Sequence, residues 1–195
     1  MDPDPGSLLL ILLVPWSVWT AAALLLLLLA CSALINGSEV AFFSLDSNQL
    51  KAIEASGLAA EQRILRLREK PRRLLATILI TSNLVNIAIV ILSYYLFSII
   101  LVPEVLHQWG LALTGWIGGL DPYQWASTIS FLISVVGITF LLVLFGEVVP
   151  KIYANLNNVA FARLMSAPVN LLMTFCAPLN TIIVRWGNVL EKKLG

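Results

Sequence analysis

Residues 125–150 read WASTISFLISVVGITFLLVLFGEVVP, an apolar run that is interrupted near its end by Glu147. About 20 apolar residues are enough for a helix to cross the hydrocarbon core of a bilayer. The run therefore predicts a membrane-spanning helix that carries a carboxylate near one end. Ionisable residues within such a helix are rare and costly, and by default they are candidates for a functional site. The stretch thus predicts both the class of protein and its first candidate residue.

The whole chain has the composition of an integral membrane protein. Of its 195 residues, 59% are hydrophobic and 12% are charged, with a mean hydropathy of +0.90. Soluble domains carry about 25% charged residues. Nucleic acid is not expected as a partner, because no basic face remains once the charges that flank the membrane are assigned. Cys31 and Cys176 lie in apolar runs and indicate neither a disulfide nor a thiolate metal site.

Three long apolar stretches are predicted to cross the membrane, at about residues 8–36, 74–101 and 125–147. The sequence has no Lys or Arg before Lys51 and none between Arg73 and Lys151. Lys and Arg concentrate in cytoplasmic loops. The pattern therefore predicts a multi-pass protein of the plasma membrane, with its amino terminus outside and its carboxyl terminus in the cytoplasm.

Two further segments are predicted to be helical without crossing the membrane. Residues 45–70 predict a cytoplasmic helical pair that turns near Gly57 and stops at Pro71. Residues 155–195 predict juxtamembrane helices. Their apolar stretch at residues 164–184 is expected to lie at the interface, because its prolines, Pro168 and Pro178, break it into short pieces.

Oxygen-bearing groups interrupt the apolar stretches at three places. These are Asn36-Gly37-Ser38-Glu39, Ser82-Asn83-Leu84-Val85-Asn86 and Gly146-Glu147. Hydroxyl, amide, carbonyl and carboxylate oxygens suit hard cations such as Mg²⁺ and Na⁺, and the residue types do not rank the two. Pro150 has no amide hydrogen to donate to the Gly146 carbonyl, which leaves that oxygen able to bind an ion.

The same residues also fit a protein that does not transport. Asn and Ser bond across membrane helices for about 0.6 kcal/mol, and up to about 2 kcal/mol. The alternative interpretation is therefore a dimeric membrane anchor or a cation-sensing module. An enzyme is not expected, because the sole histidine, His107, lies in the predicted outer segment and the sequence has no HExxH or GxSxG motif.

Three segments resemble, in chain order, the signature segments of the transmembrane domain of the CNNM/CorC magnesium transporters. They are Ser38-Glu39-Val40-Ala41-Phe42-Phe43-Ser44-Leu45, Ser82-Asn83-Leu84-Val85-Asn86 and Phe145-Gly146-Glu147-Val148-Val149-Pro150-Lys151. The resemblance covers nearly the whole chain. It implies an all-α integral membrane protein, with three transmembrane helices per subunit, a cytoplasmic helix-turn-helix and a juxtamembrane helix belt. It also implies a homodimer that exports Mg²⁺, with Na⁺ as the coupling ion, through a site open to the cytoplasm.

The resemblance further implies which residues bind the ion. The implied ligands are Ser38, Asn83, Asn86, the Gly146 carbonyl and Glu147. Ser82 stands where relatives often carry another Asn and receives no role, and Glu39 is assigned to holding helix ends or a basic partner. Relatives usually continue into a CBS-domain pair that binds adenine nucleotide. No such pair lies within residues 1–195, so the expected partners are Mg²⁺, Na⁺, membrane lipid and a second copy, without nucleotide.

Overall fold

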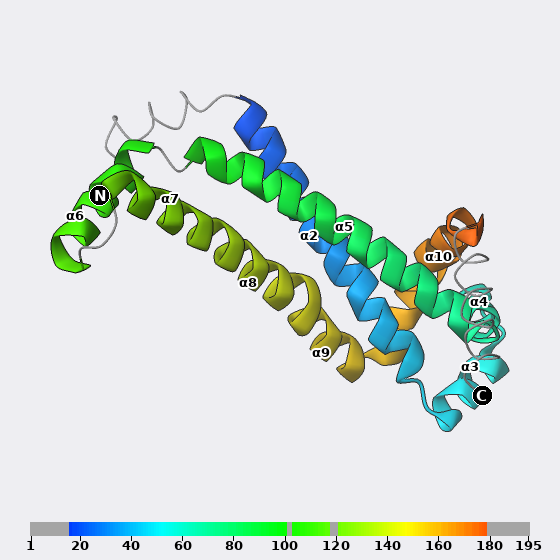
Figure 1. Ribbon diagram of the computed structural model, residues 1–195. Helices are drawn as coiled ribbons and strands as arrows, with labels where there is room; N and C mark the ends of the chain where they lie inside the picture. The colour runs from blue at the N-terminus through cyan, green and yellow to red at the C-terminus, as the bar shows by residue number, and fades with distance from the viewer. Residues whose placement is uncertain (1–15, 101–102, 118–120, 179–195) are drawn as a thin grey trace, which may run out of the picture. The chain divides into compact units, whose positions relative to one another are not determined.

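The computed structural model describes residues 16–100, 103–117 and 121–178, and within these ranges the chain forms helices and no strand. Three described helices are long and apolar enough to cross a membrane, namely Trp16–Phe43, Pro71–Phe97 and Pro122–Leu156. They confirm the predicted all-α class with three long apolar helices (Figure 1). Residues 8–15 of the first predicted span and residues 179–195 of the juxtamembrane prediction lie outside the described part.

The chain divides into two compact units, each built from parts of the long helices. The first unit takes its described residues from 1–29 and 87–142, and the second takes them from 30–86 and 143–195. All the candidate ion ligands fall in the second unit.

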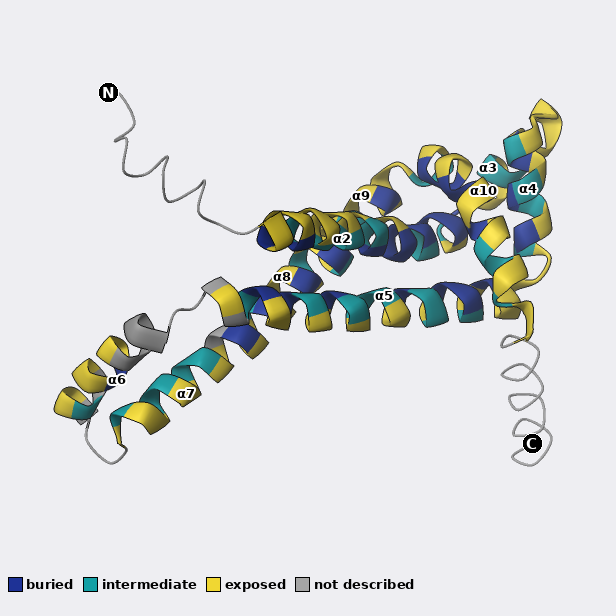
Figure 2. Ribbon diagram, turned by 90° about the horizontal axis from the view of Figure 1, so that it is seen from above, coloured by how far each residue is buried: buried dark blue, intermediate teal, exposed yellow. Residues whose placement is uncertain are grey.

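The first unit contains one helix pair packed at a glycine. Helices α6 (Pro103–Ile117) and α7 (Pro122–Leu132) lie side by side (Figures 1 and 2). A methyl group added to Gly110 would come 2.2 Å from the carbonyl oxygen of Pro122. Since a backbone atom cannot swing aside as a side chain can, the absence of a side chain at Gly110 is what permits this close approach.

The third long helix is a succession of α-helical and π-helical segments. Its order is α7, the π-turn η1 (Ile133–Gly137), α8 (Ile138–Val143), the π-turn η2 (Leu144–Val148) and α9 (Val149–Leu156). At the end of η2 the amide of Val149 donates to the Leu144 carbonyl, five residues earlier. Single π-turns of this kind within α-helices are frequent at functional sites. The predicted candidate Glu147 lies within η2.

Helix α5 (Pro71–Ile100) buries one stripe of its surface. Figure 2 shows buried positions along one side of this helix and exposed positions along the other. The buried residues are Leu74, Thr77, Ile78, Ser82, Ile89, Ser93 and Leu96, and apart from the adjacent pair Thr77 and Ile78 they follow one another at intervals of three, four or seven positions. This spacing is that of a helix with one packed face. It decides which of the polar residues on α5 point inward.

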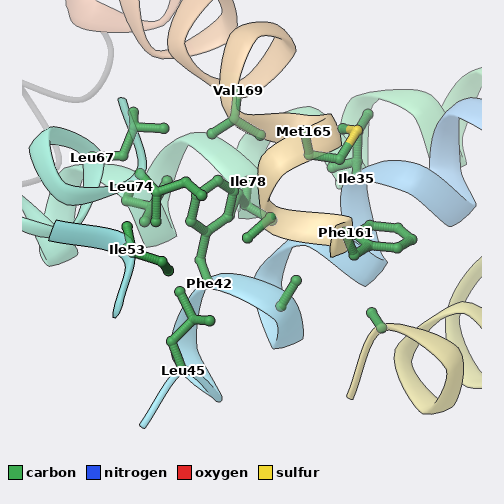
Figure 3. Close-up of a cluster of buried hydrophobic side chains, with 14 residues drawn as sticks. Ile35, Phe42, Leu45, Ile53, Leu67, Leu74, Ile78, Phe161, Met165 and Val169 are labelled. Atoms are coloured by element: carbon green, nitrogen blue, oxygen red, sulfur yellow. The ribbon is translucent and has the colours of Figure 1, made fainter. Parts of the chain in front are cut away.

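The second unit has a core formed by α2 (Trp16–Phe43), α5 and three shorter helices. These are α3 (Ser47–Ser56), α4 (Ala59–Arg68) and α10 (Asn158–Phe175). Figure 3 shows that the side chains of Phe42, Ile78 and Met165 belong to one buried cluster drawn from three different helices. The core therefore joins the end of the first long helix to the start of the second and to α10.

Polar contacts also hold the short helices of the second unit together. Gln49 and Asn158 exchange two side-chain hydrogen bonds, of 3.0 and 3.1 Å, between α3 and the start of α10. Arg163 of α10 forms an ion pair with Glu61 of α4, whose side chain is only 3% exposed. A buried carboxylate needs such a partner, since an unpaired buried charge is strongly destabilising.

Helix α10 corrects one expectation. The sequence predicts a break at Pro168, but α10 continues through it to Phe175, so that prediction is wrong. Pro168 is exposed, whereas Phe161, Met165 and Val169 are buried in the core. Proline removes one backbone hydrogen bond from a helix interior, and burial of the opposite face offsets that loss.

Gly57 joins α3 to α4 in a left-handed conformation, with a φ of 68°. We expect Gly57→Ala to lower the free energy of unfolding by about 1 kcal/mol, because an L side chain is strained at positive φ. No atom lies within 4 Å of the added methyl group, so the effect would be one of backbone conformation alone. Thermal unfolding of the purified protein measures it. The matched control is Gly115→Ala, whose methyl group is equally uncrowded, and equal melting temperatures for both variants would contradict the prediction.

Candidate functional site

Four polar groups on α2, α5 and η2 form a connected hydrogen-bond chain. The Ser32 hydroxyl donates to Asn86 Oδ1 at 2.8 Å. The side-chain Nδ2 of Asn36 donates to Ser32 Oγ at 3.2 Å and to the carbonyl oxygen of Gly146 at 2.8 Å. Each of the three long helices thus contributes at least one group to this chain, which we call the polar network: Ser32, Asn36, Asn86 and the Gly146 carbonyl.

The local sequence explains how each group reaches the polar network. Ser32 and Asn36 are four residues apart on α2, so they lie on one face of the helix. Both are buried, with exposed fractions of 0% and 5%. Gly146 is also buried, and Pro150, four residues later, has no amide hydrogen for its carbonyl. In the structure, the Gly146 oxygen accepts a hydrogen bond from the Asn36 side chain.

Close packing places the next turn of α2 against α9 and α10. A methyl group added to Gly37 would lie 2.6 Å from Phe161 Cζ and 3.3 Å from the carbonyl oxygen of Pro150. Ser38 follows and is 0% exposed, and its hydroxyl donates to the Ile35 carbonyl at 2.6 Å. The hydroxyl of Ser38 is therefore held by its own helix, next to the segment that carries Glu147.

An ion-paired group is formed by one residue each from α2, η2 and α9. Lys151 Nζ lies 3.2 Å from Glu39 Oε2 and 3.1 Å from Glu147 Oε1. All three side chains are between 31% and 42% exposed. We call these three residues the acid–lysine group. It supplies the basic partner that the sequence assigns to Glu39, and it shows what holds the carboxylate of Glu147.

The polar residues of α5 do not all turn inward. Asn86 joins the polar network, and Ser82 is buried with its hydroxyl directed to the Leu79 carbonyl at 3.3 Å. Asn83 is exposed, and its amide nitrogen donates to the same carbonyl at 2.9 Å. The structure therefore links Asn86 to Gly146 through Ser32 and Asn36, places Ser38 two residues after Asn36 and Glu147 directly after Gly146, and leaves Asn83 outside the polar network.

Sequence reasoning missed two central members of this site. Ser32 lies outside the three oxygen-bearing segments, and Asn36 lies within one of them but is not among the implied ligands. Their spacing of four residues within an apolar helix was the available signal, because it puts two polar side chains on one face. The contact between Lys151 and Glu147 could also have been predicted, because Lys151 stands four residues after Glu147.

The chemistry of the site is that of neutral oxygens with a small number of carboxylates. Among the described residues, no three His, Cys, Asp or Glu side chains gather as they would in a transition-metal site. Amide, hydroxyl and backbone carbonyl oxygens lie beside Glu39 and Glu147 instead. Such donors suit hard cations, which bind oxygen, and do not suit soft metals, which prefer sulfur.

Most of the chain matches a known protein family. Residues 23–195 match a family model described as the cyclin M transmembrane N-terminal domain, CNNM. The match includes all members of the polar network and of the acid–lysine group. A search of curated proteins found no match.

Proposed function

The chain belongs to the CNNM family, whose membrane domain is associated with Mg²⁺ transport, and from this premise we propose that it binds Mg²⁺ within the membrane and moves it across. One observation carries the proposal above the others. The polar network links Asn86 of α5 to the Gly146 carbonyl of η2 through Ser32 and Asn36 of α2, and Glu147 directly follows Gly146 in the sequence. Oxygens collected from separate helices are what a hard cation needs when it gives up water.

The proposed ligands are the oxygens of Ser38, Asn83, Asn86, Gly146 and Glu147. In the described arrangement, the Gly146 oxygen accepts from Asn36 and the Glu147 carboxylate accepts from Lys151. Mg²⁺ binding would replace these hydrogen bonds by contacts to the ion. Because Mg²⁺ requires about six oxygens at about 2.0–2.1 Å, the proposed ligands would have to move toward one another, with retained water supplying any missing oxygen.

Direction and coupling belong to the same proposal. We take the basic residues on α3, α4 and the start of α5 to face the cytoplasm, with the amino terminus outside. Glu39 lies near the end of α2 that leads to α3, which supports an ion site close to that side. The working scheme is Mg²⁺ export driven by Na⁺ entry in a homodimer.

Flux in proteoliposomes tests the proposal. The purified chain is reconstituted, and Mg²⁺ and Na⁺ gradients are imposed independently while internal Mg²⁺ is followed with a fluorescent indicator. Mg²⁺ movement that depends on the protein supports transport, and acceleration by an opposed Na⁺ gradient supports coupling. Equal rates with and without the protein would overturn the proposal.

A dimeric anchor or cation sensor is the second candidate. The favouring observation is that Ser32, Asn36 and Asn86 already satisfy one another, as residues that only hold helices together would do. A cation sensor would be stabilised by Mg²⁺, and a simple anchor would not. Neither would produce flux in the same proteoliposomes.

A further inference from the structure

We propose that Lys151 is a tethered counter-ion, which occupies the carboxylates of Glu39 and Glu147 and must release Glu147 before a divalent cation binds there. The inference rests on the proposed function and names a residue that sets the affinity of the site. In this proposal, Lys151 competes with the transported ion in addition to joining two helices.

The geometry places one ammonium group between two carboxylates. The distances from Lys151 Nζ are 3.2 Å to Glu39 Oε2 and 3.1 Å to Glu147 Oε1, which are both hydrogen-bonding distances. The three charges sum to −1. Without the lysine, the two carboxylates would present −2 to an arriving cation, and that cation would meet no resident positive charge.

The side chain can move while its backbone stays in place. Lys151 follows Pro150, whose carbonyl oxygen packs against α2 at Gly37. The lysine side chain is 31% exposed, and its ammonium group is carried on a flexible four-carbon stem. Partly exposed ion pairs contribute little net stability, so releasing one of the two contacts costs little. The ammonium group stays in contact with Glu39 when it leaves Glu147, so it remains close to the site.

The exchange has a consequence for turnover. When a divalent ion takes Glu147, Lys151 transfers fully to Glu39. When the ion leaves, the ammonium group returns and compensates the carboxylate. A site built this way binds its cargo less tightly than a bare pair of acids would, and it releases the cargo faster. Moderate affinity is what a transporter requires if the ion is to dissociate.

The test is Lys151→Met, assayed by the Mg²⁺ dependence of thermal stability and by proteoliposome flux. Removing one positive charge close to the site is expected to lower the Mg²⁺ dissociation constant about tenfold, after allowance for solvent screening. Flux at saturating Mg²⁺ is expected to fall, because release slows. If Lys151 were purely structural, its replacement would change neither the Mg²⁺ dissociation constant nor the flux at saturating Mg²⁺. Lys151→Arg, which keeps the charge, is expected to retain an affinity near that of the wild type.

The matched control is Lys51→Met, which makes the same change at an exposed position on α3. It is expected to leave both measurements unchanged. If the wild type responds to Mg²⁺ and Lys151→Met has the same dissociation constant, the counter-ion inference is overturned and the proposed function stands. If the wild type shows no Mg²⁺ response, both are overturned. Should Lys151→Met fail to fold, Lys151→Gln provides the same comparison, and failure of both to fold would make Lys151 structural and overturn the inference.

Discussion

Replacing Glu147 with glutamine is expected to reduce Mg²⁺ flux by about a hundredfold. The change keeps the size and shape of the side chain and removes its negative charge. A neutral amide oxygen attracts a dehydrated divalent cation far less than a carboxylate does, and about 2.8 kcal/mol of lost interaction corresponds to this factor. The expectation is specific to Glu147 because its carboxylate lies within η2, beside the buried Gly146 whose carbonyl is the other proposed ligand on that turn.

Stability is not expected to explain such a loss. The Lys151–Glu147 pair is an i,i+4 contact with both side chains partly exposed, and pairs of this kind contribute about 0.3–0.5 kcal/mol. Glu147→Gln should therefore melt within a few degrees of the wild type in the absence of Mg²⁺. It should lose the rise in melting temperature that Mg²⁺ produces in the wild type.

Proteoliposome flux and Mg²⁺-dependent melting measure the effect together. The matched control is Glu54→Gln, which makes the same replacement at an exposed residue of α3 and should transport normally. Transport by Glu147→Gln at the rate of the wild type would overturn the assignment of the Glu147 carboxylate as an ion ligand.

Asn36→Leu is expected to lower the free energy of unfolding by about 1–3 kcal/mol and to reduce Mg²⁺ flux about tenfold. Leucine has the same number of side-chain heavy atoms in a similar branched arrangement, and it cannot form either hydrogen bond. The Gly146 carbonyl would lose a partner at 2.8 Å in a buried position, and Ser32 would lose one at 3.2 Å. Leaving a buried acceptor unsatisfied costs about 1–3 kcal/mol.

The flux effect follows from position. Asn36 holds η2 to α2, so its loss would let the Gly146 oxygen and Glu147 move relative to Asn86. Thermal unfolding and flux of the same preparation separate the two effects. Asn170→Leu is the control, since it changes an exposed asparagine on α10. Equal stability and equal flux for both variants would show that the polar network does not organise the site.

Several elements of the fold could be predicted because their signals are local. The capping box of α3, in which Asp46 and Gln49 exchange hydrogen bonds, requires only residues three apart. The turn at Gly57 requires only a glycine at positive φ. The long apolar helices follow from composition over about 20 residues. The predicted break at Pro168 failed for the complementary reason, because burial of one face of α10 outweighed a local preference.

The candidate site divides in the same way. Glu147 and Gly146 could be found from the sequence, because an acid and a proline stand out in an apolar run. The contact of Asn36 with Gly146 could not, because those residues are 110 positions apart along the chain. Asn83 and Asn86 are equivalent by composition, yet only Asn86 reaches the polar network and Asn83 is exposed.

By itself, the sequence determined that this protein is a helical membrane protein of the CNNM family with oxygen donors in its apolar helices. Hydrophobic length, charge distribution and short motifs carry that information, since each depends on neighbouring residues. Only the tertiary structure decided which donors meet, which carboxylates hold Lys151 and which asparagine faces outward. Those outcomes depend on the rotation and packing of whole helices, because a turn of about 100° per residue moves a side chain from a buried face to an exposed one.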